Sequence, residues 1–124
     1  MSFDVFFQGF VAGESSERGG AEMRGVLAPH IVEENETFLR VRFGDGEADV
    51  YLSDDGMMAN HITGRDPWDL LVQGATAADW VIMPLDLPTC LTAPGQRENL
   101  PDGLDQEVAV VERGSDLLAL IESR

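Results

Sequence analysis

Apolar and polar residues alternate most regularly between Thr37 and Leu52, and this period of two predicts a β-hairpin. A two-residue Asp45-Gly46 loop suits the turn, because glycine tolerates the positive φ that such loops require. The expected core-facing residues are Thr37, Leu39, Val41, Phe43, Ala48, Val50 and Leu52.

The same loop predicts the partners across the hairpin. Phe43 would pair with Ala48, so that the apolar side chains stack on one face. On the other face the expected pairs are Arg42 with Asp49 and Arg40 with Tyr51.

Shorter patterns predict the remaining elements. The phenylalanine-rich segment at residues 2–12 is typical of a central strand covered on both sides, whereas residues 33–36 (EENE) indicate a polar turn. Further strands are expected at residues 57–63, 80–83, 89–92 and 108–111. Helices are expected at residues 20–28, from an N-cap at Asp66 followed by Pro67, and from an N-cap at Ser115.

Consecutive strands without an intervening helix are typical of antiparallel pairing. The sequence therefore predicts an α+β fold, with a single mostly antiparallel sheet and helices packed on a face. Its 124 residues suit one domain, residues 1–124.

Charge is the extreme feature of the composition. The chain has 23 acidic residues against 8 basic ones, all arginine, for a net charge of −15 that is spread over both halves. Such a surface repels nucleic acid and anionic membranes and attracts basic proteins. Two explanations stay open at this point: acidity that keeps the protein in solution, and acidity that recognises a basic partner.

Cysteine content and hydropathy bear on the compartment. The lone Cys90 cannot form an internal disulfide, which suits a reducing cytoplasm. No apolar run approaches the roughly 20 residues that span a bilayer, and the N-terminal segment lacks the basic start of a secretory signal. We therefore expect a cytoplasmic protein that does not enter the membrane.

Candidate catalytic and cofactor-binding residues are few. The segment from Asp45 to Gly56 begins like a calcium loop but lacks its glycine and its final glutamate. His30, His61 and Cys90 show no metal-ligand spacing, and no glycine-rich segment has a phosphate-binding pattern, so no metal or cofactor is expected. His61, near Arg65, is the one candidate general base; a surface role explains it as well.

Candidate binding residues cluster in the hairpin. Arg40 and Arg42, beside Tyr51 and Phe38, would form an arginine and aromatic island able to hold a carboxylate, unless they only form cross-strand pairs. Glu47, Asp54 and Asp55 are the acids that we expect to be displayed together for a basic partner.

The chain resembles a set of small acidic proteins from high-GC bacteria. The resemblance rests on FDVFFQGF, LAPHIV, WDLLVQ and GSDLLALI, which cover a phenylalanine-rich strand, a helix ending in Ala-Pro and two later helices. Some similar proteins neutralise toxins as immunity proteins. The resemblance implies the fold and this kind of role, and it brings no catalytic residues.

We therefore expect a non-enzymatic acidic interaction protein, of the kind that immunity proteins exemplify, which inhibits a basic partner. The alternative is a small-molecule-binding or enzymatic α+β domain with a pocket near His61, Arg65 and Trp80. The sequence predicts neither the partner nor the oligomeric state.

Overall fold

A computed structural model describes residues 3–36 and 38–123 of the chain. The helices are α1 (Gly20–Leu27), α2 (Asp66–Ala78) and α3 (Gly114–Glu122), with short 3-10 helices η1 (Ala28–His30) and η2 (Pro94–Asn99). The strands are β1 (Val5–Gln8), β2 (Phe10–Val11), β3 (Glu14–Ser15), β4 (Ile31–Glu34), β5 (Leu39–Phe43), β6 (Gly46–Leu52), β7 (Gly56–Asn60), β8 (Val81–Pro84), β9 (Thr89–Leu91) and β10 (Val108–Val110).

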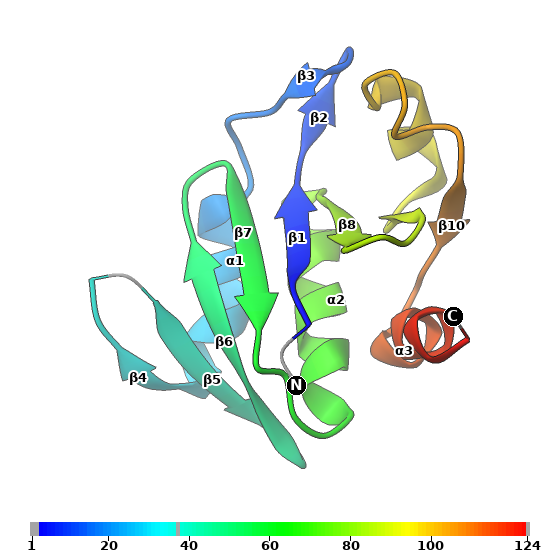
Figure 1. Cartoon of the computed structure of the whole chain (residues 1–124). Helices are drawn as coiled ribbons and strands as arrows, with labels where there is room; N and C mark the ends of the chain where they lie inside the picture. The colour runs from blue at the N-terminus through cyan, green and yellow to red at the C-terminus, as the bar shows by residue number, and fades with distance from the viewer. Residues whose placement is uncertain (1–2, 37, 124) are drawn as a thin grey trace.

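Eight of these strands form one twisted sheet in the order β10-β9-β8-β1-β7-β6-β5-β4 (Figure 1). Every pairing in it is antiparallel except that of β9 with β10. The predicted α+β fold with a mostly antiparallel sheet is confirmed. No helix in the described residues is long and apolar enough to cross a membrane.

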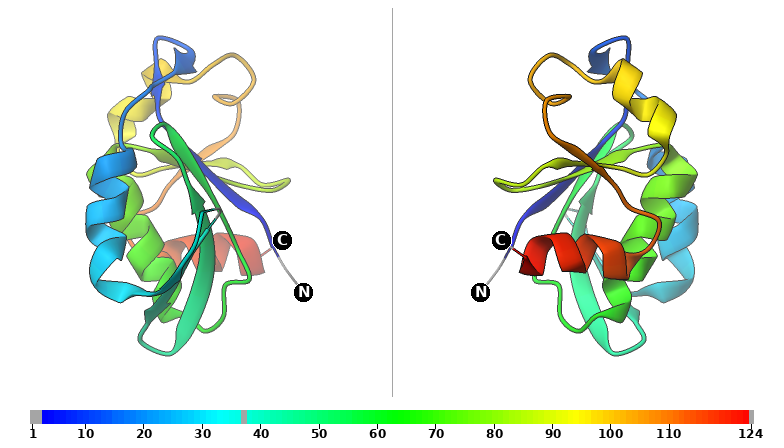
Figure 2. Two further views of the ribbon diagram at one scale, coloured as in Figure 1. Left: turned by 90° about the vertical axis from the view of Figure 1, so that its left-hand side faces the viewer. Right: turned by 90° about the vertical axis from the view of Figure 1, so that its right-hand side faces the viewer.

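One face of the sheet is covered by α1 and α2, which lie side by side (Figure 2). Alternating residues of the strands, such as Val5, Phe7, Val41 and Val50, point to these helices and are fully or almost fully buried. Helix α3 packs against α2, where the N–H of Gly114 donates to Asp69 Oδ1 at 2.9 Å. These contacts build the main hydrophobic core.

A second, smaller core lies on the other side of β8 and β9. Val81 and Leu91 are buried there beneath Leu100 and Leu104, from the segment that follows η2. The intervening Ile82 and Cys90 point to the main core, as alternation in a strand requires. The segment at residues 100–104 thus covers the outer face of the sheet only near β8 and β9.

The hairpin forms as predicted, but its register is shifted by two residues. Phe43 pairs with Gly46 rather than Ala48, and Arg42 pairs with Glu47 rather than Asp49, so the predicted pairings are wrong. Because the shift is even, every side chain stays on its expected face. Thr37, where the predicted hairpin begins, lies outside the described residues.

The shift arises at the turn. Its two loop residues are Gly44 and Asp45, and Gly44 has a φ of +58°, so glycine occupies the first loop position. The Asp45 carboxylate accepts hydrogen bonds from the backbone N–H groups of Arg65 and Asp66, at 2.9 and 2.8 Å. The turn that forms is therefore the one that brings Asp45 to the start of α2.

Two predicted helix caps are wrong. The first orphan N–H groups of α2 are satisfied by Asp45, whereas Asp66 lies inside the helix and accepts from the N–H of Asp45. At α3, Asp116 Oδ2 accepts from the N–H groups of Glu112 and Arg113, and Ser115 is a helical residue. In both cases the acceptor oxygen at the start of the helix comes from an aspartate other than the residue that the sequence predicts to cap it.

Two further expectations about the strands are also wrong. The segment EENE is a polar turn only in part, because Glu33 and Glu34 belong to the edge strand β4. Strand β1 is central, between β7 and β8, but it is covered on one face only. Phe6 points to the uncovered face and is 41% exposed.

Candidate functional site

The outer face of the sheet carries a row of large apolar side chains across five neighbouring strands. On β8, β1, β7 and β6, Met83 pairs with Phe6, Phe6 with Met58, and Met58 with Tyr51. Phe38, directly before β5, places its ring centroid 6.0 Å from that of Tyr51. We call these five residues the apolar row.

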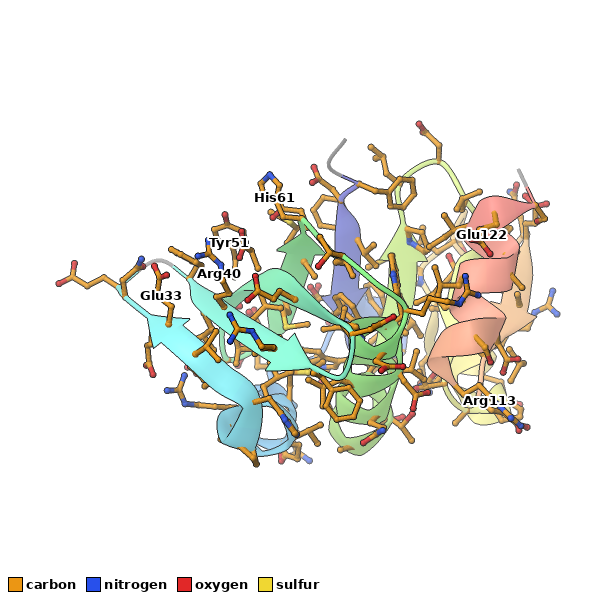
Figure 3. The ribbon with its side chains drawn as sticks, turned by 90° about the horizontal axis from the view of Figure 1, so that it is seen from below. Glu33, Arg40, Tyr51, His61, Arg113 and Glu122 are labelled. Carbon is orange, nitrogen blue, oxygen red and sulfur yellow. The ribbon has the colours of Figure 1, made fainter. Side chains whose placement is uncertain are left out.

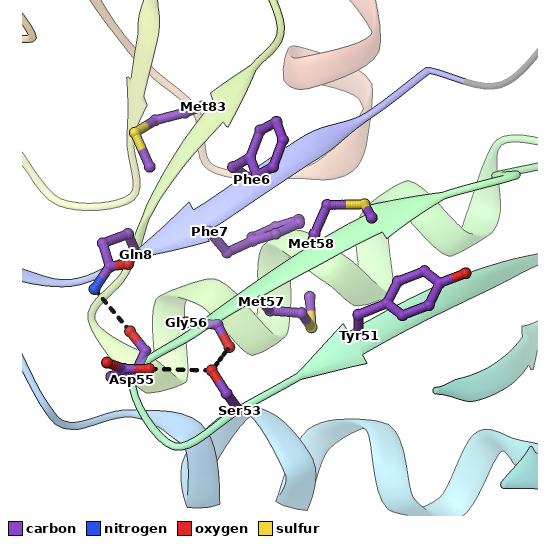
Figure 4. Close-up of a pocket in the computed structure, with 10 residues that line it drawn as sticks. All are labelled: Phe6, Phe7, Gln8, Tyr51, Ser53, Asp55, Gly56, Met57, Met58 and Met83. Atoms are coloured by element: carbon purple, nitrogen blue, oxygen red, sulfur yellow. Dashed lines mark hydrogen bonds between the residues drawn. The ribbon is translucent and has the colours of Figure 1, made fainter. Parts of the chain in front are cut away.

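Four residues of the apolar row, all except Phe38, line a shallow, open hollow of about 510 Å³. Figure 4 shows Met83, Phe6, Met58 and Tyr51 around it. One side is polar: Gln8 Nε2 donates to the carbonyl of Asp55 at 2.8 Å, and Ser53 Oγ lies 3.1 Å from Asp55 Oδ1. The hollow therefore offers an apolar floor with a carboxylate at its rim.

A second row, of charged side chains, runs beside the first. Arg40 Nε donates to Asp49 Oδ1 at 2.9 Å, and its Nη1 donates to Glu33 Oε1 at 3.0 Å. His61 Nδ1 lies 3.3 Å from Asp49 Oδ2. We call Glu33, Arg40, Asp49 and His61 the ionic row. In Figure 3, Glu33, Arg40, Tyr51 and His61 lie on the side of the sheet away from α1.

Arg40 is held firmly within the ionic row. The hydrogen bond that Arg40 donates to Asp49, followed by the charge of that carboxylate, raises the pKa of Arg40 above its ordinary value. Its guanidinium also lies 5.5 Å from the centre of the Phe38 ring. Arg40 therefore links the ionic row to the apolar row, and both of its carboxylate partners come from this chain.

His61 has a backbone φ of +50°, which is uncommon for a residue other than glycine. It borders a hollow of about 370 Å³ with Arg40, Glu47, Asp49 and Thr63. Asp49 can orient the imidazole as a carboxylate orients a general base. However, no Ser, Cys or Lys among the described residues lines this hollow, and the Thr63 hydroxyl already accepts from the N–H of Glu47 at 2.9 Å.

The other predicted binding residues lie apart from one another. Arg42 pairs with Glu47 at the turn end of the hairpin, where its Nε donates at 2.8 Å. Asp54 and Asp55 lie in the turn at the far end of β6, about 20 Å away at roughly 3.3 Å per residue. The expectation that one turn displays Glu47, Asp54 and Asp55 together is wrong.

The alternative pocket near His61, Arg65 and Trp80 does not form in the described residues. Arg65 precedes α2 and pairs with Glu122 at 3.4 Å, whereas Trp80 follows the helix, about 20 Å away at 1.5 Å per residue. Trp80 is fully buried, and its indole Nε1 donates to the carbonyl of Arg18 at 2.7 Å. It is a core residue.

Cys90 is a free cysteine buried in the core. Burial raises the pKa of the Cys90 thiol to about 12, which keeps it protonated and a poor nucleophile at neutral pH. Within residues 3–36 and 38–123, no three His, Cys, Asp or Glu side chains come together as a group that could hold a metal ion.

Sequence reasoning found Tyr51, Phe38 and Arg40 but missed Phe6, Met58 and Met83. The alternation of Val5 and Phe7 does place Phe6 on the opposite face of β1. What the sequence lacks is the strand order, which alone brings these residues into one row. Comparisons with protein-family models, curated proteins and solved structures found no match for this chain.

Proposed function

We propose that this chain is a non-enzymatic protein-binding domain that binds a basic protein through the outer face of its sheet. The observation that carries the proposal is the apolar row, which crosses the middle of that face; Met83, at one end of the row, also packs against the smaller core. Phe6 is 41% exposed and Tyr51 is 37% exposed, on strands whose other face is buried.

Acidity that serves only to keep the protein in solution does not account for such a row. A contiguous group of exposed and half-buried aromatic and methionine side chains lowers solubility, and it is typical of surfaces that bind other proteins. Phe and Tyr supply large contact areas, while the flexible Met58 and Met83 adapt to the shape of a partner.

The distribution of charge indicates the kind of partner. Arg24, Arg40, Arg42 and Arg65 each form an ion pair with a carboxylate of this chain. Much of the positive charge is therefore neutralised internally, while the acids remain in large excess. Such a surface attracts basic proteins over about 8 Å in physiological salt and repels nucleic acid and anionic lipid.

Within this class, we propose the role of an inhibitor that covers the basic active site of a partner, as the resemblance to immunity proteins suggests. The single cysteine, without an internal partner, supports a reducing bacterial cytoplasm as its compartment. An inhibitor of this kind would abolish the partner's activity at a 1:1 ratio, which a titration of activity measures.

The test compares three immobilised baits in an extract of the source organism at about 0.05 M salt. They are the natural protein, Phe6→Asp in the apolar row, and Val11→Asp as the control. Val11 is 61% exposed on β2, away from the row, and its replacement adds the same charge. Circular dichroism checks that both variants are folded.

We expect a basic protein that the natural chain and Val11→Asp retain, that Phe6→Asp does not, and that about 0.5 M salt elutes. Identical capture by all three baits, or capture that salt leaves unchanged, would contradict the proposal.

A further inference from the structure

The apolar row also indicates the form of the partner segment that lies on it. We infer that this segment is a basic amphipathic α-helix that lies across β8, β1, β7, β6 and β5. This inference rests on the proposed function and adds the conformation, length and charge pattern of the bound segment.

The conformation follows from the hydrogen bonds of the strands beneath the row. Strand β1 pairs with β7 and β8, and β6 pairs with β5 and β7, so the edges of these strands are engaged in the sheet. An extended segment laid on this face would find no backbone partner and would bring its own N–H and C=O groups against apolar side chains. A helix satisfies these groups internally.

The length follows from the spacing of the strands. Five side chains on adjacent strands span four intervals of about 4.8 Å, or about 19 Å. A helix rises about 1.5 Å per residue, so about 13 residues cover this distance. Its contact residues would recur at i, i+3, i+4, i+7 and i+11, which is the period of an amphipathic helix.

Carboxylates border the apolar row on both of its sides. This indicates that the partner helix carries basic residues on both sides of its apolar face. Asp54 and Asp55 lie in the turn that borders the hollow on one side. Asp4, whose Oδ1 is 3.4 Å from Asn60 Nδ2, lies on the other side together with the ionic row. In the ionic row the carboxylates Glu33 and Asp49 outnumber Arg40. A second copy of this chain fits less well, because it would bring another net charge of −15 to the same contact.

A third layer would complete the architecture. Helices α1 and α2 cover the inner face of the sheet, and the segment after η2 covers the outer face only near β8 and β9 (Figure 2). A partner helix across the row would bury the outer face of β1, β6 and β7 in the same way.

The test uses three synthetic peptides of 14 residues and the full-length protein. The first places leucines at helical spacing among lysines; the second has the same composition with leucine and lysine alternating; the third has helical spacing with glutamate for lysine. Isothermal titration calorimetry at about 0.05 M salt gives each Kd, and circular dichroism reports the conformation of the bound peptide.

We expect the helical basic peptide to bind at least 10-fold more tightly than the alternating one, and the acidic peptide not to bind. Phe6→Asp should weaken the binding of the first peptide at least 10-fold. Val11→Asp should leave the Kd of that peptide unchanged. If both basic peptides bind equally tightly and Phe6→Asp abolishes the binding of both, the helix inference is overturned. The proposed function would still stand in that case.

Binding that Phe6→Asp does not weaken, or no binding by either basic peptide, would count against the surface itself and so against both proposals. Sedimentation velocity of the protein alone tests the second-copy alternative. A dimer that Phe6→Asp dissociates would identify another copy as the occupant and would overturn the inference of a basic helix.

Discussion

Asp45 and Asp66 hydrogen-bond to each other's backbone. Asp45 Oδ1 accepts from the N–H of Asp66 at 2.8 Å, and Asp66 Oδ2 accepts from the N–H of Asp45 at 3.1 Å. The first residue lies in the turn of the β5–β6 hairpin and the second at the start of α2. This reciprocal contact joins the sheet to its longest helix and sets the register of the hairpin.

Replacing Asp45 by Ala should lower the melting temperature at pH 7, because two N–H groups at the start of α2 lose their acceptor. Asp45→Asn is the control and should retain most of the stability, since its amide oxygen still accepts. Equal losses in both variants would mean that the negative charge, rather than the hydrogen bonds, matters at this position.

The same residue predicts a pH dependence. Hydrogen bonds from the backbone N–H groups of Asp66 and Arg65 lower the pKa of Asp45 in the folded protein below its ordinary value of 3.8. A lowered pKa adds stability above pH 3.8, and this stability is lost as the pH falls through the folded value. The advantage of the natural protein over Asp45→Ala should therefore shrink below about pH 4. Thermal melts of the two proteins from pH 7 to pH 2.5 measure this difference in stability. A difference in melting temperature that stays constant with pH would contradict the lowered pKa of Asp45.

Replacing each of two helical glycines by alanine should change the stability of the protein in opposite directions. A Cβ at Gly25 in α1 meets no atom within 4 Å, so Gly25→Ala should stabilise the protein by about 0.5–1 kcal/mol. A Cβ at Gly114 in α3 would overlap the backbone of Trp68 and Asp69, so Gly114→Ala should destabilise it by more than about 1 kcal/mol. Urea unfolding measures both. A Gly114→Ala protein as stable as the natural one would contradict the close packing of α3 on α2.

Gln96 is a buried polar residue that holds the segment after β9 to the end of α2. Its Oε1 accepts from the N–H of Thr92 at 2.8 Å, and its Nε2 donates to Asp79 Oδ1 at the same distance. Gln96→Ala should cost about 1–3 kcal/mol in unfolding free energy, because buried groups lose their partners. Gln96→Glu should lower the free energy of unfolding more at pH 7 than at pH 4, because protonation of a carboxylate at the lower pH removes the repulsion between the introduced glutamate and Asp79. A pH-independent cost would show that the two side chains are not in contact.

Cys90 should be unreactive in the folded protein. Its thiol is buried and its pKa is raised to about 12, so alkylation by iodoacetamide at about pH 8 should occur only through unfolding. The alkylation rate should rise with urea in parallel with the unfolded fraction, which mass spectrometry can follow. Rapid alkylation without urea would mean that the sheet opens around β9.

The hairpin was predictable from sequence because its period of two does not depend on the rest of the chain. Its register was not, because the register depends on the contact of Asp45 with residues twenty positions further on. The edge strand β4 was missed for a related reason: its exposed EENE segment has the composition of a turn, and its pairing depends on β5. Local sequence patterns predict the individual strands and helices, whereas the pairing of strands depends on contacts between residues far apart in the sequence.

The candidate site was predictable only in part. The hairpin by itself brings Tyr51, Arg40 and Phe38 close together, and these residues stand out in the sequence. Phe6, Met58 and Met83 join them only because β1 lies between β7 and β8, so that residues from three distant segments meet. Met58 and Met83 also resemble core residues by type, and only the exposed outer face distinguishes them from Met23 and Met57, which are buried.

The methionines provide the most direct test of the outer face as the binding surface. In a sample labelled with ¹³C at the methionine methyls, the helical lysine–leucine peptide or the captured partner is titrated while methyl spectra are recorded. We predict that the Met58 and Met83 signals shift with the saturation curve, while the signal of Met23, 0% exposed in the core, stays in place. Saturable binding that leaves the Met58 and Met83 signals unmoved would contradict the account.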